Sequence, residues 1–121
     1  MGFRELIKKV QHYSGFSDAE SKDALEMMVE SLAVHLTEGE RKDFASQLPQ
    51  ELKDIALSVR ATEENSREDM LKQFMEIQHI EESRAKKQIL CAWRALKEAI
   101  SPGEIEDIRA QLPNRMVAFL H

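Results

Sequence analysis

The 121-residue chain carries the same landmarks twice, 64 residues apart, and this duplication constrains its fold more than any other feature. Six identities recur at one fixed spacing without a gap. The first copy has Gly39, Glu40, Asp43, Gln47, Leu48 and Pro49, and the second has Gly103, Glu104, Asp107, Gln111, Leu112 and Pro113. Apolar positions coincide under the same shift, for example Leu25 with Ile89 and Leu32 with Leu96. A fixed internal period of this kind predicts two copies of one supersecondary unit.

Composition decides the class of that unit. Good helix formers (Ala, Leu, Met, Glu, Lys, Arg and Gln) supply 70 of the 121 residues, whereas Val, Ile and Thr supply only 15. We therefore predict an all-α chain of two tandem four-helix repeats. The expected helices cover residues 3–13, 18–36, 38–47, 49–59, 67–78, 82–100, 102–111 and 113–120.

A hydroxyl residue followed three positions later by an acid marks the start of four of these helices. The spacing occurs at Ser17 and Glu20, Thr37 and Glu40, Ser66 and Asp69, and Ser101 and Glu104. In a capping box the hydroxyl accepts a hydrogen bond from a first-turn N–H, and the acid accepts one from the N–H of the cap itself.

The polar stretch 60–66 is the natural linker between the halves 1–60 and 65–121. Neither half is long enough to close a good core alone. We therefore expect residues 1–121 to form a single domain of eight helices, with the two repeats related by an approximate twofold axis.

The duplicated pattern resembles the bacterial family called domain of unknown function 2267. Each half of that family carries L-x-x-x-L-[ST]-x-G-E and then D-[FILV]-x-x-Q-L-P. The first copy reads Leu32-Ala-Val-His-Leu36-Thr37-Glu38-Gly39-Glu40 and then Asp43-Phe44-Ala-Ser-Gln47-Leu48-Pro49. The second reads Leu96-Lys-Glu-Ala-Ile100-Ser101-Pro102-Gly103-Glu104 and then Asp107-Ile108-Arg-Ala-Gln111-Leu112-Pro113. The resemblance implies an all-helical bacterial domain with no established activity.

Charge and hydropathy argue against several classes of function. With 17 Lys and Arg against 22 Asp and Glu, the net charge of −5 disfavours a nucleic-acid binder. No apolar run is long enough to span a membrane, and the charged N-terminus is unlike a signal peptide. The single cysteine, Cys91, forbids an internal disulfide, so we expect a cytoplasmic protein.

No set of residues is complete enough to predict catalysis, a cofactor or a metal. Glu76 and His79 have the spacing of one half of a di-iron motif, but the second half is missing. His12, His35 and His121 have no partner at metal-ligand spacing. The repeated Gly-Glu…Asp…Gln-Leu-Pro segment could be a ligand site, but we interpret it as a structural corner. In this interpretation Glu40 and Glu104 fill capping boxes, and Gln47 and Gln111 bond to backbone groups.

Outside their apolar stripes, the two long helices carry faces of opposite charge. The first presents Glu20, Asp23, Met27 and Glu30, and the second presents Arg84, Lys87, Cys91 and Arg94. One interpretation is two solvated faces that have diverged. The sharper hypothesis is that the faces meet, within one chain or between chains. An antiparallel meeting would bring Glu20 to Arg94 and Glu30 to Arg84.

Two functional classes remain. The first is a non-enzymatic interaction module that binds itself or a protein partner through a helix face. The second is a binder of a small molecule, with a pocket at the seam between the repeats.

Overall fold

The computed structural model describes residues 1–65 and 69–120 of the chain. It contains the eight expected helices, with no strand among the described residues. These are α1 (Phe3–Ser14), α2 (Asp18–Val34), α3 (Glu38–Ser46), α4 (Gln50–Ser58), α5 (Met70–Gln78), α6 (Glu82–Ala99), α7 (Pro102–Gln111) and α8 (Asn114–Phe119).

Short-range hydrogen bonds explain where the helices begin. The hydroxyls of Ser17, Thr37 and Ser101 each accept a hydrogen bond from the N–H three residues later, so these three caps are confirmed. The fourth expected cap, Ser66, lies outside the described residues. Asp69 caps α5 instead, accepting from the backbone N–H groups of the two following positions, which places the helix start at Met70 rather than at residue 67.

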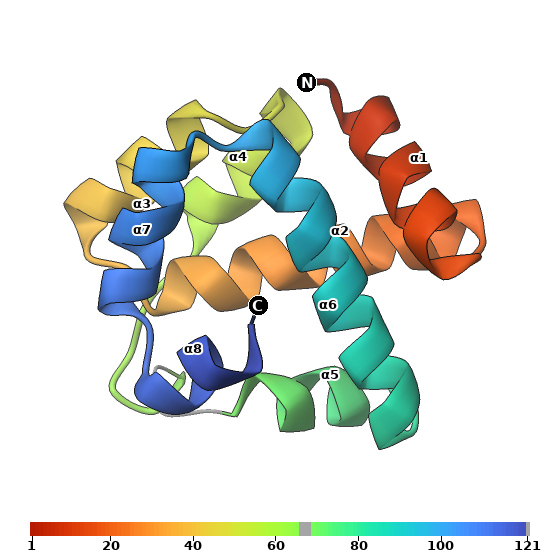
Figure 1. Ribbon diagram of the computed structural model, residues 1–121. Helices are drawn as coiled ribbons and strands as arrows, with labels where there is room; N and C mark the ends of the chain where they lie inside the picture. The colour runs from red at the N-terminus through yellow and green to blue at the C-terminus, as the bar shows by residue number, and fades with distance from the viewer. Residues whose placement is uncertain (66–68, 121) are drawn as a thin grey trace.

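The two long helices, α2 and α6, form the centre of the molecule, and α6 crosses α2 in Figure 1. Helix α1 packs against both of them, and α5 packs against α6. Helices α3 and α4 pack against each other, and α4 also covers α2. Helix α7 contacts α3, so the segments 1–60 and 69–120 touch at both the central crossing and the α3–α7 contact.

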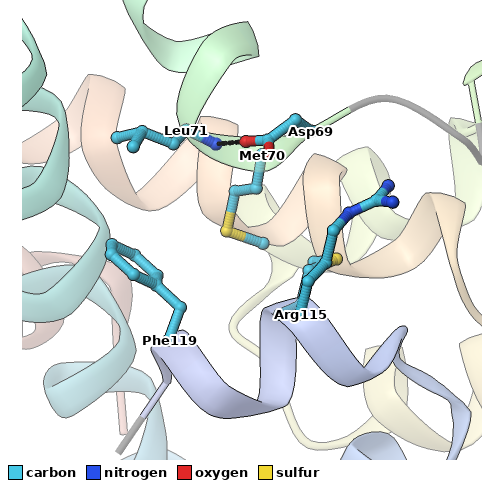
Figure 2. A pocket seen from close by; sticks show the side chains of 6 residues that line it. Asp69, Met70, Leu71, Arg115 and Phe119 are labelled. Carbon is cyan, nitrogen blue, oxygen red and sulfur yellow. Dashed lines mark hydrogen bonds between the residues drawn. The ribbon is translucent and has the colours of Figure 1, made fainter.

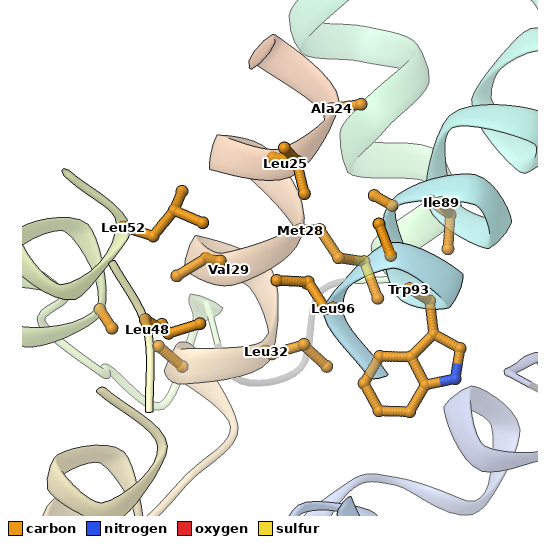
Figure 3. Close-up of a cluster of buried hydrophobic side chains, with 14 of the residues drawn as sticks. Ala24, Leu25, Met28, Val29, Leu32, Leu48, Leu52, Ile89, Trp93 and Leu96 are labelled. Atoms are coloured by element: carbon orange, nitrogen blue, oxygen red, sulfur yellow. The ribbon is translucent and has the colours of Figure 1, made fainter. Parts of the chain in front are cut away.

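The apolar stripes predicted for the long helices form the core. Figure 3 shows side chains of α2, including Met28 and Leu32, directed toward Trp93 and Leu96 of α6. Trp93 is 1% exposed. Burial of each such side chain stabilises the fold by about 1.5–3 kcal/mol. Among the described residues, no helix is both long enough and apolar enough to cross a lipid bilayer.

Candidate functional site

The oppositely charged faces of α2 and α6 meet at one point within the chain. Arg84 Nε donates a hydrogen bond to Glu20 Oε2 at 2.8 Å, and Arg84 Nη2 donates to Glu20 Oε1 at 2.5 Å. Gln88 Nε2 also donates to Glu20 Oε2, at 2.9 Å. Hydrogen bonding to the Arg84 guanidinium holds the pKa of Glu20 below its usual value.

Within the chain, the antiparallel pairing considered in the sequence hypothesis is wrong. Glu20 pairs with Arg84 and not with Arg94, and Glu30 is exposed, with no hydrogen bond or ion pair to another described residue. The reason is geometric. Because α6 crosses α2 (Figure 1), the two faces approach only near the start of each helix and do not run side by side.

The basic side chains of α6, although exposed, lie beside aromatic rings of the segment that includes α1. The Arg84 guanidinium lies 4.3 Å from the centre of the Phe16 ring, and Lys87 Nζ lies 5.4 Å from the same ring. The Arg94 guanidinium lies 4.0 Å from the centre of the Tyr13 ring. These are cation–π contacts, which favour basic residues over acidic ones on this face.

Two acids on the face of α2 have no comparable contact. Asp23 and Glu30 are exposed and bond to no other described residue, and Met27 between them is half-buried. These residues share one face because they lie three or four positions apart on the helix. One surface of the molecule is thus both acidic and unpartnered.

Two hollows lie along this face. The first has a volume of about 580 Å³ and is bordered by Asp23 of α2, by Ile77 near the end of α5 and by Ile80 just after that helix. The second has a volume of about 310 Å³ and is bordered by the side chains Glu30, Asp54, Ile55, Ser58 and Val59. We call this surface, from Asp23 through Met27 to Glu30 with its two flanking hollows, the α2 groove.

Ile77, beside the α2 groove, is not packed against a helix as its repeat counterpart is. Its sequence counterpart 64 residues earlier, Tyr13, packs against α6 and donates a hydrogen bond to Glu98 Oε2 at 2.7 Å. Ile77 is instead 62% exposed. Helix α5 packs against α6, which leaves the outer face of α2 open.

The repeated corner segments contact each other, and they do so through the glutamines. Thr37 N–H donates to Gln111 Oε1 at 2.8 Å, and Ser101 N–H donates to Gln47 Oε1 at 2.7 Å. Each glutamine therefore caps a helix in the other half of the chain. This corrects the capping-box prediction, because the N–H groups expected to bond to Glu40 and Glu104 are taken by Gln111 and Gln47. Leu48 and Leu112 are buried, as expected.

Glu40 and Glu104 do not bond to the N–H groups of the cap residues, and their carboxyl groups lie close to each other. Carboxylate oxygens of Glu40, Asp43 and Glu104 all lie within 4.8 Å of one another, and we call these three residues the carboxyl cluster. Glu104 is only 6% exposed. Burial, followed by the neighbouring Glu40 carboxyl, raises the pKa of Glu104 to about 8. Asp107, the fourth repeated acid, is exposed on α7 and adds to the negative field.

Sequence reasoning missed this cluster, although one signal for it was present. The same acid occurs at the same place in both copies, and equivalent residues near a twofold axis meet each other. The prediction of a structural corner treated each copy separately, so it did not consider that two helices carrying the motif could pack together.

The other candidate residues are not brought together. Glu76 forms an ion pair with Lys72, with 3.8 Å between Lys72 Nζ and Glu76 Oε1. His79 is exposed at the end of α5. His12 contacts the Tyr13 ring, and His35 Nδ1 lies 2.8 Å from the Ser31 carbonyl oxygen. His121 lies outside the described residues.

Cys91 is half-buried against the core. Burial raises the pKa of its thiol, although Lys87 and Arg94 oppose the shift, so the thiolate is disfavoured at neutral pH.

A smaller hollow, of about 110 Å³, lies between α5 and α8. Figure 2 shows Met70 pointing into it between Phe119 and Arg115, close to the hydrogen bond from Leu71 N–H to Asp69. A site of this size is small for a ligand, since pockets that enclose small molecules occupy about 300–1,000 Å³.

A comparison with protein-family models matches residues 3–119, nearly the whole chain, to one family, described as an uncharacterized conserved protein (DUF2267). No curated protein matches the chain.

Proposed function

The chain belongs to the DUF2267 family, whose description names no activity, and we propose that it is a non-enzymatic interaction module whose α2 groove binds a basic amphipathic helix of a protein partner. The observation that carries this proposal is the difference between the two long helices. The exposed basic side chains Arg84 and Arg94 of α6 lie against the rings of Phe16 and Tyr13. The exposed acids Asp23 and Glu30 of α2 have no hydrogen-bond or ion-pair partner among the described residues.

We also propose that the internal sequence repeat is a structural repeat. Its support is that several contacts join repeat-equivalent residues: Glu20 with Arg84, and Glu40 with Glu104. The crossed caps, Thr37 with Gln111 and Ser101 with Gln47, are exchanged by the same 64-residue shift. If the halves are related by an approximate twofold axis, the α2 groove is the counterpart of the surface that α1 covers on α6.

Charge and shape determine the kind of partner. Asp23, Glu30 and Asp54 give the groove an acidic rim, and the half-buried Met27 and Ile55 give it apolar patches. An amphipathic helix meets both requirements, with its apolar face in the groove and its basic residues at the rim. Exposed ion pairs of this kind contribute about 0.2–1 kcal/mol each, so they set orientation while apolar side chains in the hollows supply affinity.

The test uses a fluorescein-labelled, 18-residue peptide of Leu and Lys with helical periodicity, and fluorescence anisotropy as the readout. We expect the wild-type chain to bind it with a Kd of about 10 µM. Replacing Asp23→Lys and Glu30→Lys together should weaken binding at least tenfold, because both acids lie on the rim and bond to no other described residue.

A matched control separates the groove from general charge attraction. Glu5→Lys with Glu106→Lys makes the same change in net charge, from −5 to −1, since each substitution adds two units, and both residues are exposed on other helices. If the control loses as much affinity as the groove variant, or if the wild type does not bind, the proposal is wrong. If the wild type forms a dimer that the groove variant does not form, the partner helix belongs to a second copy.

A small molecule at the seam is the second candidate, and the larger hollow favours it because its lining comes from both halves, including Glu20 and Arg84. Native mass spectrometry of protein purified from its host tests this candidate. A bound small molecule that is lost in an Asp23→Lys variant would favour it, and a spectrum of the bare chain would count against it.

A further inference from the structure

The carboxyl cluster at the contact between α3 and α7 contains buried carboxyl oxygens that accept no hydrogen bond. Glu104 is only 6% exposed, and its Oε1 atom is fully buried without a hydrogen-bond donor. Glu40 Oε1 is in the same state. A buried carboxylate is costly unless a proton, a donor or a cation compensates its charge.

The nearby backbone donors are already used. The backbone N–H groups of Thr37 and Ser101 donate to the two glutamines, and the N–H groups of Glu40 and Glu104 donate to the cap hydroxyls. Arg41, the nearest base in the sequence, directs its guanidinium to the carbonyl oxygens of Ala33 and Leu36. The carboxylate oxygens are left facing one another.

We propose that Glu40, Asp43 and Glu104 bind one hard divalent cation of the Ca²⁺ class. The ligand atoms are all carboxylate oxygens, which suit Ca²⁺ and Mg²⁺ and not the soft metals that prefer sulfur. Oxygens up to 4.8 Å apart fit around an ion with bonds of about 2.3–2.6 Å, the range for Ca²⁺, more readily than around Mg²⁺ at about 2.0–2.1 Å.

Solvent access to the carboxyl cluster and the negative charge around it also favour a bound cation. Asp43 is exposed, so an ion can enter from solvent and keep water on its open side. Asp107 strengthens the negative field at Glu104. Glu40 and Glu104 lie in the first turns of α3 and α7, where the positive end of the helix dipole acts against a cation, which limits the expected Kd to about 0.1–1 mM.

The experiment measures Ca²⁺ binding by calorimetry and Tm by thermal unfolding, in the intact chain and at constant ionic strength. We expect one Ca²⁺ per chain and a rise in Tm of about 5 °C at 10 mM Ca²⁺. Glu104→Gln should abolish both effects, and Asp43→Asn should weaken binding about tenfold. Glu106→Gln is the matched control, since it removes an exposed acid of the same helix and should leave binding unchanged.

Two results would overturn the proposal. One is no binding and no change in Tm at 10 mM Ca²⁺, which would mean that Glu40 and Glu104 share a proton. The other is binding that survives Glu104→Gln, which would place the ion elsewhere. Because Asp43 is exposed, the Asp43→Asn variant keeps the test decisive even if Glu104→Gln does not fold.

Discussion

Replacing His79 with glycine should stabilise the folded chain. His79 follows α5 at φ 54° and ψ 49°, the left-handed region, and no other non-glycine residue described by the structure has a positive φ. Gly15, 64 residues earlier, follows α1 in the same region at φ 77°. In that conformation a Cβ atom comes too close to backbone carbonyl oxygens, and glycine avoids the contact.

The expected gain follows from three terms. A left-handed conformation costs an L-residue about 1–2 kcal/mol. Glycine also gives the unfolded chain more conformational freedom, which reduces the gain in unfolding free energy by about 0.5–1 kcal/mol. The His79 side chain is exposed and bonds to no other described residue, so its loss removes no contact. The net gain in unfolding free energy is about 0.5–1 kcal/mol, or about 2–5 °C in Tm.

Urea denaturation followed by circular dichroism measures this difference, with two variants as references. His79→Ala keeps the Cβ atom and should give no gain, and Gly15→Ala should lose about 1 kcal/mol for the opposite reason. If His79→Gly and His79→Ala change stability equally, the effect comes from the imidazole and the argument from backbone strain is refuted.

Four further predictions follow from the contacts and from burial. Glu20→Arg should lower stability, with partial recovery on adding Arg84→Glu, whereas Glu30→Arg alone should leave stability unchanged; no recovery in the double variant would contradict the pairing. Because the folded-state pKa of Glu20 lies below its ordinary value of 4.5, its stabilisation is present above about pH 4.5 and is lost as the pH falls through the folded pKa, so acid denaturation should be less steep for Glu20→Gln. Gln111→Ala should cost about 0.5–1.5 kcal/mol in denaturant titrations by leaving Thr37 N–H without its partner, and an unchanged midpoint would mean that water replaces the glutamine. Cys91 should react slowly with a thiol reagent at pH 7 and rapidly once unfolded, and equal rates would show that burial does not protect the thiol.

Local signals in the sequence account for the helices and the core. A hydroxyl cap such as Ser17 or Ser101 bonds within its own first turn, so its effect can be predicted without knowing the fold. The stripes that include Leu32 and Trp93 follow from the 3.6-residue period, since one face of a helix must be buried.

The partners of polar side chains were decided only by tertiary structure. The sequence put opposite charges on two faces, but the crossing of α2 and α6 selected Arg84 for Glu20 and left Glu30 exposed. The packing of α3 against α7 paired the backbone N–H groups of Thr37 and Ser101 with glutamines from the other half and brought Glu40 to Glu104. Helical periodicity determines which residues share a face, whereas contacts between distant faces depend on the angle and position at which helices cross, which no local pattern specifies.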